Sequence, residues 1–292
     1  PAEVWTLFVP DHDTPLMPAM GNRPGLAYDC AVVTPPAIPF SQTTLLVPLH
    51  YRGGSLLDGI YGTGYPGEWV LGLDDWLPNG QNTFWYGYAD TYDITSTATP
   101  ALTSGTVIDY TLRRVDFTLD WVLRTFPIDS TRVFAFGYSM GGAGSVLMGT
   151  HFGDRFAATM SVVGKSDYSF DADPDTTCWF NPNGSLRKLA NAMWGTLAAN
   201  LPASEGGRIY EQLDAGWLAE HAPERPFAPM YLYAGKLDIT MGWAENAPFW
   251  ESMQTAGRGS AFYWETRHHN ETYQAIWAPT QDPRVASFLS RP

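Results

Sequence analysis

The stretch that decides the fold is residues 132–148, which read RVFAFGYSMGGAGSVLM. An apolar run ends at Gly137, and Gly137 and Gly141 stand two residues either side of Ser139. This order predicts a buried strand that turns sharply into a helix, with the serine in a strained conformation that exposes its hydroxyl. Glycines are needed because side chains there would collide with the crowded turn. The alternative is a glycine-rich turn with an incidental serine, and the flanking strand and helix argue against it.

Two further apolar runs, 43–49 and 229–234, also end at glycine-bearing loops, which is typical of buried parallel strands that lead into functional loops. Between 43–49 and the serine strand lies an amphipathic helix that ends before Pro127. Its apolar stripe, with spacings of 3, 4, 3 and 4, consists of Leu112, Val115, Leu119, Val122 and Phe126. Strand, helix and strand in succession build a parallel sheet. The runs 4–9 and 28–33 add strands at one edge.

The whole chain, 1–292, is therefore expected to form a single α/β domain in which helices flank a mostly parallel central sheet. Two regions interrupt this order. Residues 55–106 are rich in Gly, Trp and Tyr, and 166–226 carry Pro, Asp and Asn before a weakly helical stretch. We interpret 166–226 as an insertion that lies over the sheet as a lid or cap, because a segment of about 60 residues is near the lower limit for folding alone.

A serine hydroxyl becomes nucleophilic only with a neighbouring base, which a carboxylate orients. In a strand–turn–helix nucleophile of this type, the chain order is serine, acid and histidine. Asp238 comes just past the end of the run 229–234 and is the candidate acid. His268 and His269 follow the predicted strand 261–264 and are the only histidines after Asp238. One of them is the candidate base, and the residues alone leave open which.

In motif order, residues 43–290 resemble the α/β-hydrolase superfamily, most specifically at 132–144. The narrower resemblance is to its secreted esterase and depolymerase branch, which includes feruloyl-esterase-like, polyhydroxyalkanoate-depolymerase-like and cutinase-like enzymes. It implies an α/β-hydrolase fold and an ester hydrolase that acts through an acyl-enzyme without a cofactor. Members often carry Gly-His at the catalytic histidine, and His268 stands where that glycine would be. The resemblance favours His269 as the base, with His268 as the alternative.

An oxyanion hole needs two backbone N–H groups aimed at the developing negative charge. Met140, the residue after the nucleophile, is expected to supply one. The loop 50–54 is expected to supply the other, and related enzymes commonly read His-Gly at its start. Tyr51 replaces that glycine, so Tyr51 and Arg52 are both candidates, and we favour the main chain of Arg52. His50 is expected to brace the loop.

Aromatic side chains are candidates for substrate binding, because rings that line a cleft can stack on sugars, phenolic groups or polyester rings. Most of the twelve tryptophans are expected to pack in the core. Tyr51, Trp85, Trp179 and Trp243 lie in loops near the predicted site. We therefore expect the substrate to be a small-molecule or polymeric ester, such as a plant-wall ester, a polyester or another acyl ester.

Two other functions compete with ester hydrolysis. A serine peptidase of the same fold has the same triad, but such peptidases usually carry an additional large domain that screens substrates. A catalytically silent binding protein fits less well, because the serine, acid and histidine all follow in order.

The formal charge of -13 opposes binding to nucleic acid and to anionic membranes, and no apolar run is long enough to span a bilayer. The chain begins with Pro1, so we expect a removed leader and a secreted protein. Two glycosylation sequons start at Asn183 and Asn270, and a glycan at Asn270 would obstruct the site. This favours a bacterial host that does not use them, with the protein extracellular or periplasmic.

Neither a resident metal nor a redox centre is expected. The acidic loop 171–175 lacks the glycine and glutamate of an EF-hand, so a solvated loop is expected and another kind of structural cation site is the alternative. Cys30 and Cys178 have no metal-ligand or C-x-x-C spacing. They form either a disulfide across a long loop or two buried free thiols, and the sequence leaves both open.

Overall fold

The computed structural model describes residues 2–35, 43–62, 67–98 and 100–271. The strands in these ranges are β1 (Ala2–Val9), β2 (Leu26–Val33), β3 (Leu45–Leu49), β4 (Trp69–Leu73), β5 (Tyr88–Ala89), β6 (Val107–Ile108), β7 (Val133–Tyr138), β8 (Ala158–Val162), β9 (Met230–Gly235) and β10 (Ser260–Glu265). The helices are α1 (Leu56–Gly62), α2 (Tyr110–Thr125), α3 (Met140–His151), α4 (Ser185–Trp194), α5 (Ile209–Gln212), α6 (Ala215–His221) and α7 (Asn246–Thr255).

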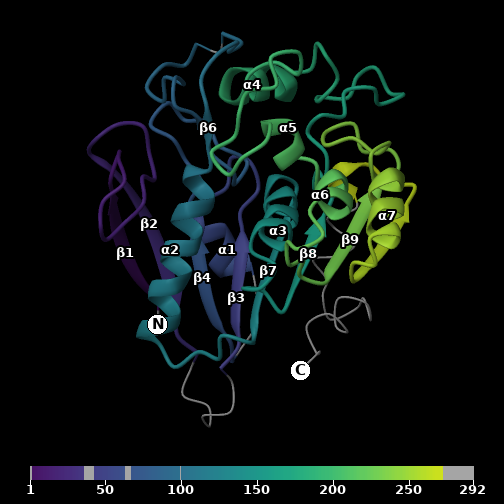
Figure 1. Ribbon diagram of the computed structural model, residues 1–292. Coiled ribbons are helices and arrows are strands. Elements are labelled where there is room, and N and C mark those ends of the chain that lie inside the picture. The colour runs from purple at the N-terminus through teal and green to yellow at the C-terminus, as the bar shows by residue number, and fades with distance from the viewer. Residues whose placement is uncertain (1, 36–42, 63–66, 99, 272–292) are drawn as a thin grey trace.

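One large sheet has the strand order β1-β2-β4-β3-β7-β8-β9-β10. β2 pairs antiparallel with β1 and β4, and every pair from β4 to β10 is parallel. The carboxyl ends of the parallel strands therefore meet at one edge, which is the upper edge in Figure 1. The predicted α/β fold with a mostly parallel sheet is confirmed.

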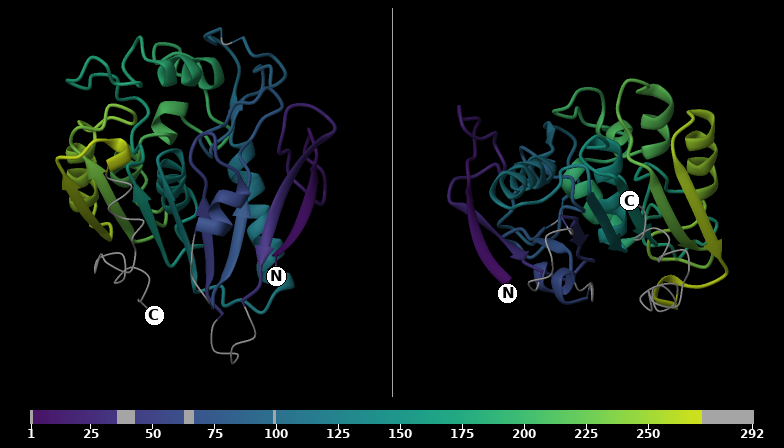
Figure 2. Two further views of the ribbon diagram at one scale, coloured as in Figure 1. Left: turned by 180° about the vertical axis from the view of Figure 1, so that it is seen from behind. Right: turned by 90° about the horizontal axis from the view of Figure 1, so that it is seen from below.

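Helices cover the two faces of this sheet unequally. In Figures 1 and 2, α2, α3, α6 and α7 lie on one face, whereas α1 lies on the other. Successive residues of a strand point to opposite faces. Leu45 and Val47 of β3 accordingly pack in the cluster that includes α2 and α3, while Leu46 packs in the cluster that includes Leu56 and Ile60 of α1. Burial on both faces explains why β3 is apolar throughout.

The strands predicted from apolar runs are all present, and the predicted amphipathic helix is α2. Two strands of the large sheet, β4 and β8, were missed, and so were the short strands β5 and β6. β4 lies inside the aromatic-rich region and contains Gly72, where a Cβ would stand 2.7 Å from Ile60 of α1. β8 carries Thr159 and Ser161, which made it look polar, yet both are buried. At Gly72 the close packing of α1 on the sheet requires a small residue, and in β8 two buried polar residues obscured the apolar pattern.

The predicted lid region, 166–226, divides into two parts in space. α4 and α5 lie over the upper edge of the sheet (Figure 1). α6 lies in the helical layer instead, where Ala215 and Ala219 pack with Phe249 and Met253 of α7. A lid role for this region stays a prediction, and it applies to the part that contains α4 and α5.

Cys30 and Cys178 are both buried free thiols in the structure, which is the second of the two alternatives, and they do not form a disulfide. Burial raises the pKa of Cys30 to about 11, and Asp29 adds to this effect. Within the described ranges, the helices are all too short or too polar to cross a bilayer.

Candidate active site

Ser139 lies at the turn between β7 and α3, with φ 58° and ψ -120°. This backbone region is rarely adopted by residues other than glycine, and strain of this kind is concentrated at functional sites. A Cβ on Gly137 would stand 2.4 Å from the backbone of Gly141, and a Cβ on Gly141 would stand 2.0 Å from the carbonyl oxygen of Leu49. Only hydrogen fits at both positions, which is the physical reason for the glycine spacing.

Ser139, His269 and Asp238 are joined by two hydrogen bonds in a line. The Ser139 hydroxyl donates to Nε2 of His269 at 2.9 Å, and Nδ1–H of His269 donates to Oδ2 of Asp238 at 2.6 Å. Because the carboxylate holds the proton on Nδ1, the lone pair of Nε2 faces the hydroxyl. All three residues are buried. This arrangement can take a proton from the serine as its oxygen attacks an acyl carbon.

The carboxylate of Asp238 lies in a tight turn directly after β9. The backbone amide of Asp238 donates to the carbonyl oxygen of Gly235 at 3.1 Å. Its Oδ1 accepts from the amides of Thr240 at 2.8 Å and Met241 at 3.1 Å. One carboxylate oxygen is thus bound within the turn, which leaves Oδ2 aimed at His269.

His268 has different partners from its neighbour. Its Nδ1 contacts the carbonyl oxygen of Leu237 at 2.9 Å, and its amide donates to Glu271 at 3.2 Å. The side chain of His268 is exposed, whereas that of His269 is buried against Ser139. Of the two candidate bases, the structure brings His269 and not His268 to the serine.

Tyr138 holds the histidine loop over the nucleophile, and the sequence analysis did not identify this residue. Its hydroxyl donates to Oδ1 of Asn270 at 3.0 Å, and its ring centroid lies 5.0 Å from that of His269. The sequence signal for this residue was its position directly before Ser139, at the end of β7. The sequon at Asn270 extends to Thr272, which lies outside the described residues.

The two expected sources of oxyanion N–H groups lie at a helix start and in a turn. Met140 is the first residue of α3, and the first amides of a helix have no partner within it. The amide of Gly54 donates to the carbonyl oxygen of Tyr51 at 2.9 Å, which closes a turn that contains Arg52. The exposed Arg52 side chain reaches Gln81 at 3.5 Å, and a role for its main chain at the site stays a prediction. The choice between Tyr51 and Arg52 stays a prediction.

His50 supports this turn from beneath. Its Nδ1–H donates to the carbonyl oxygen of Tyr51 at 2.8 Å, and its Nε2 accepts from the amide of Asp75 at 3.0 Å. Burial lowers the pKa of His50, which favours the neutral ring that these two bonds require. Asn82 contributes a further contact, since its Oδ1 accepts from the amide of Gly53 at 3.4 Å. These contacts fit the expectation that His50 braces the loop.

The expectation that Trp85 contacts substrate is wrong. Trp85 is 0% exposed. Its indole N–H donates to the carbonyl oxygen of His50 at 3.3 Å, and its amide donates to Oδ2 of Asp75 at 3.1 Å. A Cβ on Gly144 of α3 would stand 2.5 Å from its ring. Trp85 therefore packs between the loop 50–54 and α3, beneath the surface.

The other three candidate aromatic residues retain exposed or half-buried rings. Tyr51 is 38% exposed, and its ring centroid lies 6.3 Å from that of Tyr138. Trp179 is 43% exposed, and its amide donates to the carbonyl oxygen of Ile239, next to the acid. Trp243 is half-buried and makes an edge contact with Trp264 at 5.2 Å. Substrate binding by these residues stays a prediction.

The acidic loop 171–175 uses its carboxylates internally. Oδ2 of Asp173 accepts from the amide of Trp243 at 2.9 Å, and Oδ1 of Asp175 accepts from the amide and hydroxyl of Thr177 at 2.9 and 2.6 Å. Across the part of the chain that the structure describes, no group of three or more His, Cys, Asp or Glu side chains is arranged to hold a metal ion. The structure thus gives no support to the alternative of a cation site.

Residues 116–280, more than half of the chain, match the model of a family described as "Putative esterase". This segment includes Ser139, Asp238 and His269. No curated protein matches the chain.

Several solved structures are similar over almost the whole chain. FphF, a fluorophosphonate-binding serine hydrolase of Staphylococcus aureus, is 16% identical with a TM-score of 0.59, and the match covers 100% of both chains. An S-formylglutathione hydrolase from Agrobacterium tumefaciens is 17% identical with a TM-score of 0.64, covering 98% of this chain and 94% of that one. The acylaminoacyl peptidase of Pyrococcus horikoshii is 14% identical with a TM-score of 0.60, covering 90% of this chain but 39% of its own. At such identities the likeness shows the α/β-hydrolase fold.

Proposed function

The chain belongs to the esterase family whose model matches residues 116–280, and we propose that Ser139, His269 and Asp238 are its catalytic triad. The enzyme is a carboxylic ester hydrolase. The observation that carries the assignment is the 2.9 Å hydrogen bond between the Ser139 hydroxyl and Nε2 of His269, with the serine held at a strained turn.

In the proposed reaction, the oxygen of Ser139 attacks the ester carbonyl while His269 takes the hydroxyl proton. The Asp238 carboxylate stabilises the imidazolium that forms. The amides of Met140 and Arg52 hold the oxyanion, and collapse of the tetrahedral intermediate releases the alcohol with the proton from His269. His269 then activates a water molecule that hydrolyses the acyl-enzyme.

The proposed substrate is an ester with an aromatic or other planar group, such as a plant-wall ester or a polyester. The support is the pair of exposed rings, Tyr51 and Trp179, near the serine and the acid. Aromatic side chains offer a stacking surface for planar groups. A peptidase of the same fold is the second candidate, because an acylaminoacyl peptidase, matched over 39% of its own length, is among the similar structures.

A fluorophosphonate probe followed by peptide mapping tests the nucleophile. We expect labelling at Ser139 and the loss of labelling and activity in Ser139→Ala, by about 10⁴- to 10⁶-fold in kcat. Ser145→Ala, which removes a buried hydroxyl from the same helix, is the matched control and should label normally. Labelling at another residue, or an active Ser139→Ala, would contradict the assignment.

A substrate panel tests the class. It contains p-nitrophenyl esters, feruloyl and acetylated sugars, a polyester film, S-formylglutathione and aminoacyl anilides. We expect the highest kcat/KM among the aromatic oxygen esters. Faster cleavage of the anilides than of every ester would favour a peptidase, and a strong preference for the thioester would replace the proposed substrate.

Secretion is likewise a proposal, and fractionation of a producing bacterial strain tests it.

A further inference from the structure

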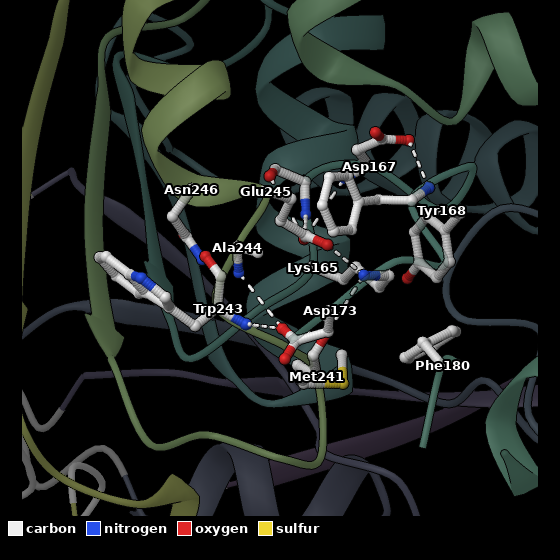
Figure 3. A network of polar contacts seen from close by, with 12 residues as sticks. Lys165, Asp167, Tyr168, Asp173, Phe180, Met241, Trp243, Ala244, Glu245 and Asn246 are labelled. Carbon is white, nitrogen blue, oxygen red and sulfur yellow. Dashed lines mark hydrogen bonds and ion pairs between the residues drawn. The ribbon is translucent and has the colours of Figure 1, made fainter. Parts of the chain in front are cut away.

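A buried ion pair lies beside the acid turn and is not part of the triad. Lys165 and Glu245 are each 2% exposed, and the Lys165 ammonium contacts the Glu245 carboxylate directly (Figure 3). Taking two charges out of water costs several kcal/mol per ion before their attraction is counted. Replacing such a pair with neutral side chains is often harmless to stability, so stability is a weak explanation for its presence.

The pair joins the loops that follow two neighbouring strands. Lys165 comes three residues after β8, and Glu245 is the last residue before α7, at the end of the loop that follows β9. Oε1 of Glu245 accepts from the amide of Ser166 at 2.8 Å and from that of Asp167 at 3.4 Å. Both carboxylate oxygens of Glu245 are therefore bonded, Oε2 to the Lys165 ammonium and Oε1 to the loop that follows β8.

Lys165 also contacts the turn that carries the acid. Its ammonium donates to the carbonyl oxygen of Met241 at 3.1 Å, and the amide of Met241 donates to Oδ1 of Asp238 at 3.1 Å. The other oxygen of Asp238 accepts from His269. Two hydrogen bonds therefore connect the Lys165 ammonium to the carboxylate that orients the base.

A second contact holds the two loops together without the pair. Oδ2 of Asp173 accepts from the amides of Trp243 at 2.9 Å and Ala244 at 3.3 Å (Figure 3). The Phe180 ring packs 4.7 Å from the Lys165 ammonium, and its apolar surface would remain if the charge were removed. Loss of the Lys165 ammonium should then disturb the position of Met241 more than the attachment of the loop.

We propose that Lys165 is a positioning residue for the acid: it holds the carbonyl of Met241 so that the turn presents the Asp238 carboxylate to His269, and Glu245 is its counter-ion. This inference rests on the proposed triad. It predicts that Lys165 contributes to kcat through Asp238, with little effect on substrate binding.

Two variants separate positioning from ion pairing. Glu245→Gln breaks the pair but keeps the Lys165 donor on Met241. The double variant Lys165→Met/Glu245→Gln removes that donor and both charges, so no unpaired charge is left buried. We expect kcat to fall by about 10- to 100-fold in the double variant, with KM within about twofold, and to fall only a few-fold in Glu245→Gln.

The pH profile gives a readout that simple destabilisation would not move. A carboxylate beside a histidine favours the charged ring, so a poorly placed Asp238 stabilises the charged ring less. In the double variant we expect the acid limb of kcat/KM to move to lower pH by about half a unit or more. The rate of fluorophosphonate labelling at Ser139 should fall in parallel with kcat.

Glu205→Gln is the control. It neutralises a carboxyl that contacts His151 and Arg225, and it should leave kcat and the acid limb unchanged. If the double variant is unfolded at the assay temperature, Lys165→Gln/Glu245→Gln replaces it, because glutamine is one bond too short to reach Met241. A folded variant with wild-type kcat and acid limb would overturn the role of Lys165. Absence of labelling in the wild-type enzyme would instead overturn the triad itself.

Discussion

At the scale of single residues, the Asp238 carboxylate divides its two oxygens between two tasks. Oδ1 accepts two amides of its own turn, and Oδ2 accepts Nδ1–H of His269. The first task fixes where the carboxylate lies, and the second fixes which nitrogen of His269 carries the proton. A general base needs both its position and its tautomer set before the substrate arrives.

The adjacent histidines give a direct test at this scale. His269→Ala should lower kcat by about 10⁴-fold or more, because members of a triad act as a unit. His268→Ala should retain most activity, since its ring contacts the carbonyl oxygen of Leu237 and not the serine. Steady-state kinetics of both variants, with circular dichroism to verify folding, measures the difference. Inactivation by His268→Ala with an active His269→Ala would reverse the assignment.

At the scale of elements, the contact between β7 and α3 depends on hydrogen atoms at two glycines. Gly137→Ala would place a Cβ 2.4 Å from the backbone of Gly141, and no flexible side chain is there to move aside. We expect a loss of stability of about 1–3 kcal/mol from overpacking, together with a slower reaction with a fluorophosphonate.

Gly80→Ala is the control for this substitution. Gly80 has a positive φ of 74°, which Gly137 does not, and nothing lies within 4 Å of its added Cβ. Its cost should be about 1 kcal/mol of backbone strain, without an effect on labelling of Ser139. Thermal melts and labelling rates compare the two variants. Equal effects on Ser139 labelling would mean that the loss of a glycine in general, and not the close approach at Gly137, governs the elbow.

At the scale of the whole molecule, the segment above the sheet is tied to the helical layer by a charged cluster. Glu205, between α4 and α5, contacts His151 at the end of α3 at 2.9 Å and Arg225 after α6 at 3.5 Å. Burial raises the pKa of Glu205, but His151 and Arg225 outweigh burial and lower it to about 2.

This lowered pKa predicts how stability depends on pH. A carboxyl whose pKa is lower in the folded state stabilises the protein above its unfolded pKa of about 4.5, and this contribution is lost as pH falls toward about 2. Glu205 should contribute on the order of 3 kcal/mol in this way. In urea unfolding between pH 5 and 2, the free energy of unfolding should fall less steeply for Glu205→Gln than for the wild type. Glu224→Gln, which changes an exposed carboxyl nearby, should follow the wild type. Parallel curves for all three proteins would contradict the prediction.

The cysteines give a second test of the whole molecule. Cys30 and Cys178 are buried and free, and burial raises the pKa of both thiols. A thiol reagent should therefore find no reactive cysteine in the native enzyme and two after denaturation without reductant. Finding none after denaturation would show that the two cysteines form a disulfide.

Local signals made a large part of this architecture predictable. The strands β3, β7 and β9 are apolar because both of their faces are buried, and each has a glycine at its end or in the loop that follows. The triad candidates could be chosen because they follow such strand ends in order. β4 and β8 were missed, since Gly72, Thr159 and Ser161 interrupt the apolar pattern although all three lie in buried strands.

The sequence by itself determined which residues can turn, which can pack and which can transfer a proton, because these properties depend on a residue and its near neighbours. Tertiary structure alone decided that His269 and not His268 contacts Ser139, and that Trp85 is buried against the loop 50–54. It also paired Lys165 with Glu245 across 80 positions of the chain. Contacts at such separations depend on how the strands are ordered in the sheet, and no local sequence pattern specifies that order.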